Sequence, residues 1–159
     1  MDALACFRRA LKSALLAVVL ALPAAALPFG GPLPDASTPQ NPDYIAGESA
    51  IQAKDWAGAI GYFSRLTDDR NYAASAYNRM GYAERQLGHL DAAFRHYDKA
   101  LALDPKHRGA HEYIGEAYLI AGDRAKAEEH LAILDKLCFF GCEEYSELKK
   151  KISEYKRKQ

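Results

Sequence analysis

Apolar side chains between residues 74 and 107 recur at spacings of three and four, in two runs that Gly88 separates. This spacing places side chains on one face of an α-helix, so each run predicts a helix with one buried face. The first run comprises Tyr77, Met80, Gly81, Ala83 and Leu87, and the second comprises Leu90, Ala93, Phe94, Tyr97, Ala100 and Leu101. We expect Gly88 to end the first helix and Pro105 to stop the second, because proline lacks the amide donor of a further turn.

The same pattern returns when the sequence is shifted by 34 residues, which predicts three units over about 40–73, 74–107 and 108–141. Three sets of residues align: Gly47, Gly81 and Gly115; Ala59, Ala93 and Ala127; and the larger Phe63, Tyr97 and Leu131. Gly88 and Gly122 also align, whereas the first unit has Lys54 at that place. Small residues at fixed places predict that two antiparallel helices approach closely there.

A period of 34 residues with these small residues resembles the tetratricopeptide repeat family, whose units are stacked helical hairpins. The middle unit matches best and ends in Asp104-Pro105, whereas the third has Cys138-Phe139 there and the first ends irregularly between Thr67 and Tyr72. The resemblance implies an all-α, right-handed solenoid of about three hairpins over residues 42–141.

Residues 142–159 predict a basic amphipathic helix that caps the last unit. Tyr145, Leu148, Ile152 and Tyr155 form one apolar stripe, and lysines and Arg157 occupy most of the remaining positions. The exposed side of a terminal repeat needs such a cover with a polar outer face.

The N-terminal region reads as an export signal followed by a spacer. Residues 1–26 contain 20 apolar residues, with three cations ahead of an apolar run that is too short to span a bilayer. We therefore predict a signal peptide cleaved after Ala26, with a retained anchoring helix as the alternative. The stretch from Leu27 to Pro42 holds five prolines and two glycines, which predicts a flexible linker over 27–41, with a Pro-rich ligand as the alternative.

Charge is unevenly distributed along the chain. The full sequence has 21 cations and 21 anions, but residues 40–148 carry 12 cations and 18 anions, and residues 149–159 carry six cations and one anion. This balance disfavours a nucleic-acid partner, and no stable membrane span is expected after cleavage. The basic end is either the solvated face of the cap or a contact for anionic lipid or another polyanion.

No constellation of residues predicts catalysis, a cofactor or a metal site. A Gly-rich phosphate loop, a nucleophile elbow and a His-Glu-x-x-His sequence are all absent from the sequence. His107 and His111 stand four apart, but no third ligand is evident near them, and His89, His96 and His130 are scattered. The sequence therefore predicts a protein that is not an enzyme.

Cys138 and Cys142 are the cysteines that remain after signal cleavage. Gly141 allows a turn that would bring the two sulfurs together, so we predict a structural disulfide that clamps the cap to the last unit. Two alternatives stay open: the cysteines are free or intermolecularly paired thiols, or they bind a metal or carry out redox chemistry. This pair, followed by Glu-Glu-Tyr, also resembles a small group of exported bacterial repeat proteins.

The resemblance implies that the first helices of successive hairpins line a concave groove for a partner peptide. The matching groove residues are Tyr44, Glu48, Ile51, Gln52, Asn78, Arg79, Tyr82, Arg85, Gln86, Glu112, Tyr113, Glu116 and Leu119. The Lys and Asn pattern of the subclass that grips a C-terminal carboxylate is missing, since Asn78, Tyr82, Glu112 and Glu116 stand at those places. Mixed charge in the groove predicts a partner segment of mixed charge with some apolar content.

These features together predict a non-catalytic adaptor for protein–protein interaction, exported to the periplasm or secreted. The alternative is a periplasmic thiol- or metal-handling protein that uses Cys138 and Cys142. The sequence does not specify the partner or the oligomeric state.

Overall fold

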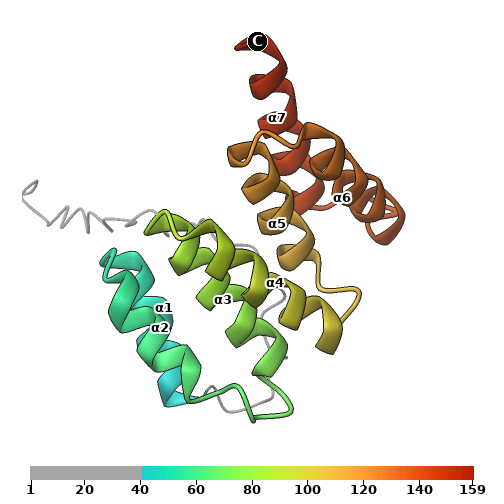
Figure 1. Cartoon of the computed structure of the whole chain (residues 1–159). Coiled ribbons are helices and arrows are strands. Elements are labelled where there is room, and N and C mark those ends of the chain that lie inside the picture. The colour runs from blue at the N-terminus through green and yellow to red at the C-terminus, as the bar shows by residue number, and fades with distance from the viewer. Residues whose placement is uncertain (1–40) are drawn as a thin grey trace, which may run out of the picture.

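The computed structural model describes residues 41–159, which form seven α-helices and no strand (Figure 1). The helices are α1 (Pro42–Gln52), α2 (Trp56–Ser64), α3 (Ala73–Gln86), α4 (Leu90–Leu103), α5 (Arg108–Ile120), α6 (Arg124–Leu137) and α7 (Glu143–Arg157). The predicted signal peptide, and the predicted linker up to residue 40, lie outside the described residues.

Consecutive helices pair as hairpins, α1 with α2, α3 with α4 and α5 with α6 (Figure 1). Each hairpin stacks on the next through α2 against α3 and α4 against α5, and α7 packs against both α5 and α6. The prediction of an all-α helical-repeat solenoid is confirmed. Among the described helices, none is both long and apolar enough to cross a bilayer.

Helix starts follow the local sequence. A side-chain acceptor caps the first turn of four helices, and the capping residues are Asn41, Asp55, His107 and Asp123. Such caps satisfy backbone amides that have no partner within the helix. Pro42 directly follows the Asn41 cap, at a position where its missing amide hydrogen is not needed.

The turns within the three hairpins share one backbone conformation. Gly88 and Gly122 both have φ of +83°, in the left-handed region that glycine enters without steric conflict. Lys54, which stands at the equivalent place in the first unit, has φ of +59°. The first hairpin therefore makes the same turn as the others with a residue that is less suited to it.

Two of the aligned glycines lie where a ring from the second helix of the hairpin crosses the first. An added Cβ on Gly47 would lie 2.6 Å from Cζ of Phe63, and one on Gly81 would lie 2.6 Å from Cε1 of Tyr97. Both rings are fully buried. Glycine is required at both places because any side chain would displace a core aromatic ring.

The third unit achieves the same close approach differently. The atom nearest to a Cβ on Gly115 would be Cδ2 of Leu148, at 2.7 Å, and Leu148 belongs to α7 rather than to α6. Leu131 stands where the other units have an aromatic ring, and it is only partly buried. A leucine lacks the reach of a ring, so the cap fills the space over Gly115.

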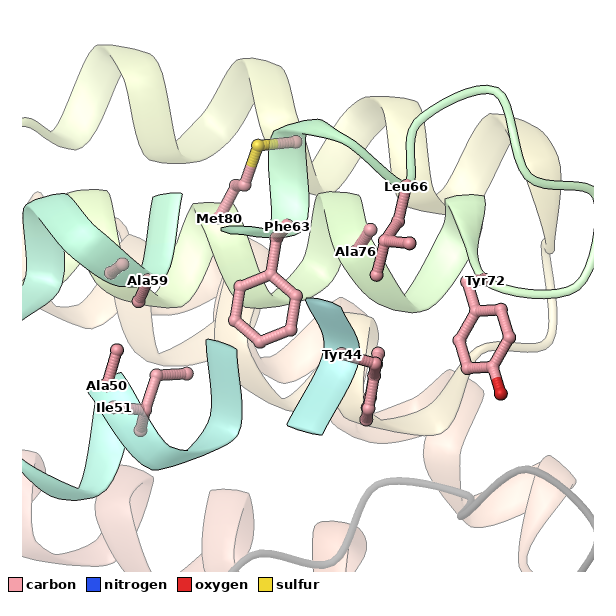
Figure 2. Close-up of a cluster of buried hydrophobic side chains, with 10 residues drawn as sticks. Tyr44, Ala50, Ile51, Ala59, Phe63, Leu66, Tyr72, Ala76 and Met80 are labelled. Atoms are coloured by element: carbon pink, nitrogen blue, oxygen red, sulfur yellow. The ribbon is translucent and has the colours of Figure 1, made fainter. Parts of the chain in front are cut away.

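The core consists of three successive clusters rather than one centre. Figure 2 shows the first cluster, in which the Tyr44 ring lies 5.5 Å from the Phe63 ring and 5.3 Å from the Tyr72 ring. Leu66 and Tyr72 hold the irregular connection between α2 and α3 onto this cluster, since they are 2% and 4% exposed. Residues 65–72 thus replace the sharp turn of the middle unit without leaving the core open.

Candidate interaction groove

The predicted groove residues lie on α1, α3 and α5, but several are buried in the structure. Tyr44, Asn78, Arg79, Glu112, Tyr113, Ile51 and Leu119 are buried, and Glu48, Tyr82, Arg85 and Glu116 are partly buried. Gln52 and Gln86 are exposed. Only some of the predicted groove residues are therefore accessible to a partner, namely the exposed and partly buried ones.

Two arginines of α3 connect neighbouring hairpins. Arg79 Nε lies 2.6 Å from Oε1 of Glu48 on α1, and Arg85 Nη1 lies 2.8 Å from Oε2 of Glu116 on α5. Glu48 Oε1 accepts no hydrogen bond from the described residues, so its contact with Arg79 Nε is an ion pair. Burial lowers the pKa of Arg79, but the carboxylate of Glu48 together with Tyr113 and Tyr44 outweighs it, so the pKa is raised.

Tyrosine hydroxyls also accept hydrogen bonds from the two arginines. Arg79 Nη1 donates to Tyr113 Oη at 3.4 Å, and Arg85 Nε donates to Tyr97 Oη at 3.4 Å. These bonds hold both guanidinium groups within the stack. The sequence pattern identified Arg79 and Arg85 as groove residues, but it did not indicate that they join the repeats to one another.

Three aromatic rings from α2, α3 and α5 lie next to one another. The Trp56 and Tyr82 ring centroids are 6.0 Å apart, and those of Tyr82 and Tyr113 are 5.2 Å apart. The Arg85 guanidinium carbon lies 5.3 Å from the Tyr82 centroid and 5.7 Å from the Tyr113 centroid. Tyrosine and arginine are the residue types that most often anchor protein interfaces.

Glu112 lies close to further carboxylates at the boundary between α5 and α7. Burial raises the pKa of the Glu112 carboxyl to about 8, and the neighbouring carboxylates of Glu116 and Glu144 add to the rise. Glu144 of α7 is 3% exposed and lies 3.6 Å from Nε of Arg108. At neutral pH Glu112 is therefore mostly protonated and can donate a hydrogen bond.

A hollow of about 280 Å³ lies where the groove meets the cap, and we call it the α7 hollow. It is lined by Arg85 of α3, by Glu116, Leu119 and Ile120 of α5, and by Lys151, Glu154, Tyr155 and Lys158 at the end of the chain. Ile120 is 58% exposed there. The sequence reasoning missed this hollow because it treated the cap and the groove as separate features.

A larger hollow of about 580 Å³ lies between the α2–α3 connection and the end of α4. Its lining includes Asp68, Arg70, Leu103, Asp104 and His107. In the sequence, the irregular end of the first unit between Thr67 and Tyr72 was the feature that could have indicated this hollow. The lining contains both positive and negative side chains, so it does not indicate which kind of ligand would bind there.

The two cysteines meet at the junction of α6 and α7. Their Sγ atoms are 2.02 Å apart and their Cα atoms 5.5 Å apart, and Gly141 has φ of +85° in the turn between them. A carboxylate oxygen of Glu144 and both sulfurs lie within 4.8 Å of one another. The geometry suits a disulfide, and it also assembles the side chains that the thiol or metal alternative would use.

His107 and His111 have separate partners. His107 Nδ1 accepts from the Ala110 amide as a helix cap, whereas His111 Nδ1 lies 2.9 Å from Nδ1 of His130. His111 Nε2 lies 3.0 Å from the Pro105 carbonyl oxygen, so it carries the proton and His130 Nδ1 donates to His111. Burial, together with His111, lowers the pKa of His130 to about 4.

Stacked helical hairpins with a terminal cap define this chain as a helical-repeat protein. A family model described as tetratricopeptide repeat matches residues 74–107, the unit in which the sequence pattern is clearest. Residues 74–107 therefore match a tetratricopeptide repeat, and the fold of the chain as a whole is shared with solved structures of tetratricopeptide repeat domains.

Three solved structures show the similarity. A complex of the TPR2B domain of yeast Sti1 with pHsp70 is 17% identical, with a TM-score of 0.66 over 74% of this chain and 95% of that one. PcrH in complex with the chaperone-binding region of PopB is 21% identical, with a TM-score of 0.59 over 71% and 90%. The Yersinia enterocolitica chaperone SycD, with a peptide of the translocator YopD, is 22% identical, with a TM-score of 0.60 over 71% and 86%.

Proposed function

We propose that this chain is a non-catalytic scaffold that binds a peptide segment of another protein along its groove. The observation that carries the proposal is the row of aromatic rings over α2, α3 and α5, with Arg85 lying against two of them. The ion pairs between hairpins support it, because a surface fixed before binding loses little conformational entropy on binding. Structures of this fold in complex with peptide or protein segments are consistent with the same use.

The partner segment is of mixed charge with apolar side chains. The groove arginines already have carboxylate partners within the chain, so a strongly charged ligand would have to displace them. Apolar or aromatic side chains of the partner would instead lie against the partly exposed rings of Trp56 and Tyr82. Polar groups of the partner would be met by exposed residues such as Gln52 and Gln86.

Photo-crosslinking from chosen positions tests this surface. A photoreactive residue at Gln52 or Gln86 is expected to capture a partner, whereas one at Arg95 or Lys99, both exposed on α4, is not. All four positions are exposed, so the substitution disturbs no core contact. Capture of the same partners from α4 as from the groove positions would contradict the proposal.

We further propose that the protein works in an exported compartment, with its cysteines oxidised. The apolar segment over residues 1–26 and the Cys138–Cys142 geometry support this setting. N-terminal sequencing of the protein from the envelope fraction should begin at Leu27, and the intact mass should be lower by two hydrogens than that of the reduced chain. An uncleaved N-terminus, or free thiols, would contradict it.

A thiol- or metal-handling role for Cys138 and Cys142 is the second candidate function. The position of the buried Glu144 carboxylate beside both sulfurs favours it, because two thiolates and a carboxylate are ligands that zinc accepts. Titration of thiols in the native protein, together with elemental analysis, distinguishes the two functions. Reactive thiols or stoichiometric metal would support this candidate over the purely structural disulfide.

A further inference from the structure

Two phenylalanines protrude from the cysteine loop, and we call them the aromatic knob. Phe139 is 86% exposed and Phe140 is 96% exposed, and their ring centroids are 5.0 Å apart with perpendicular planes. The loop is closed by the Cys138–Cys142 bond and by a hydrogen bond of 2.7 Å from the Gly141 amide to the Cys138 carbonyl. The knob is therefore held away from the protein by a short loop, and its contiguous apolar surface is typical of an interaction site.

The α7 hollow offers an apolar floor with a basic rim. Leu119, Ile120 and Tyr155 supply apolar surface, and Ile120 is more than half exposed in the absence of a partner. On the rim, Lys151 and Lys158 make no ion pair within 4 Å among the described residues, whereas Arg85 is paired with Glu116.

The knob and the hollow of one molecule cannot meet. The knob precedes the first residue of α7, and the hollow is lined by residues of the second half of that helix and by Lys158 after it. An α-helix rises 1.5 Å per residue, so Lys151 to Lys158 lie about 12–22 Å along the chain from the first residue of α7. Only the knob of a second copy can reach the hollow.

The charges at the two ends of α7 are opposite. Around the knob, residues 135–147 carry the accessible carboxylates of Asp135, Glu143 and Glu147 against the cation Lys136, while Glu144 is buried beside Arg108. The lining of the α7 hollow contains the cations Arg85, Lys151 and Lys158 and the anions Glu116 and Glu154, and residues 149–158 as a whole carry six cations and one anion. Opposite charges on the two surfaces would orient the approach of one copy to another.

We propose that the aromatic knob of one copy inserts into the α7 hollow of a second copy. The interface joins two different surfaces, so it builds either an open head-to-tail row or a pair in which each copy receives the knob of the other. An anionic bilayer fits the knob less well, since the carboxylates lie beside the rings and the lysines lie at the far end of α7.

Sedimentation over a wide range of concentration tests the proposal with the mature, oxidised chain. The wild type is expected to associate, and Phe139→Ser with Phe140→Ser, or Lys151→Glu with Lys158→Glu, is expected to weaken association about tenfold or more. Leu103→Ser, which changes another exposed apolar residue on α4, is the matched control and should associate normally. A wild type that stays monomeric throughout would overturn the proposal.

A mixing experiment tests the pairing itself. The knob variant keeps an intact hollow and the lysine variant keeps an intact knob, so an equimolar mixture should form a one-to-one dimer that neither variant forms alone. Absence of that dimer, with the wild type still associating, would show that the knobs pack on each other, and would overturn the proposal. Phe-dependent sedimentation with phosphatidylglycerol vesicles by a monomeric wild type would instead assign the knob to lipid.

Discussion

Arg79 of α3 and Glu48 of α1 form an ion pair of 2.6 Å between Nε and Oε1, with the arginine side chain only 6% exposed. The pair joins the first hairpin to the second at a place where water has little access. Arg65, directly after α2, and Asp43 of α1 form a second pair, at 2.9 Å, within the first hairpin, and their side chains are 62% and 34% exposed. The two ion pairs are therefore of the same chemical type but differ in how far they are buried.

We expect the Arg79 pair to stabilise the fold far more than the Arg65 pair. Arg79→Met leaves a carboxylate without its partner and should lower the free energy of unfolding by about 3 kcal/mol, whereas Arg65→Met should change it by less than about 1 kcal/mol. Urea unfolding of double-mutant cycles with Glu48→Gln and Asp43→Asn measures both coupling energies. Equal coupling energies would show that burial does not decide the contribution.

Substitution at the helix crossing should distinguish close approach from helix propensity. Gly81→Ala should lower the free energy of unfolding by about 1–3 kcal/mol, because the buried Tyr97 ring has to move. Gly61→Ala is the control, since no atom lies within 4 Å of its added Cβ. It should raise stability by about 0.5–1 kcal/mol through helix propensity. The interpretation fails if both variants shift the urea midpoint in the same direction.

The turn of the first hairpin contains a correctable strain. Lys54 has a positive φ that costs a residue with a Cβ about 1 kcal/mol, so Lys54→Gly should raise the free energy of unfolding by about 0.5–1 kcal/mol. Lys54→Ala keeps the unfavourable φ and should not stabilise. Thermal and urea unfolding of the two variants give the comparison, and stabilisation by alanine as well would attribute the effect to the lost lysine charge.

Glu112 should make stability depend on pH. Its pKa is about 8 in the folded chain and about 4.5 as a free group, so the folded state binds more protons between these values. Stability contributed by the protonated carboxyl is therefore lost as pH rises from about 4.5 to about 8, by up to a few kcal/mol. Glu112→Gln should remove this slope, and Glu129→Gln, on an exposed residue, should leave it. Parallel pH profiles for wild type and Glu112→Gln would contradict the assignment.

The period of 34 residues was sufficient to predict the fold class and the helical hairpins, because small residues and glycine turns report local geometry. It also identified Lys54 as the exception at a turn that the structure does form. It did not predict the packing of Leu148 over Gly115, because that contact depends on how far Leu131 reaches. Side-chain reach across an interface is a tertiary property that no single periodic pattern contains.

The helices of the predicted groove followed from the sequence, but the partners of its charged residues did not. Repeat matching placed Arg79, Arg85 and Glu116 on the first helices of successive hairpins, and they lie on α3 and α5, with Arg79 buried. The pattern could not show that Arg79 and Arg85 pair with Glu48 and Glu116, since pairing across repeats depends on the offset between hairpins. The partner-binding role of these residues stays a prediction until the crosslinking experiment is made.

Leu148 of the cap lies over Gly115 in place of a ring from the third hairpin itself. The last unit and the cap are therefore one inseparable module, whereas the first two units each contain their own glycine and ring. A unit duplicated after residue 141 would separate Leu148 from Gly115, but a unit duplicated between residues 107 and 108 would leave that contact intact. Gene duplication can lengthen this protein in its middle and not at its end.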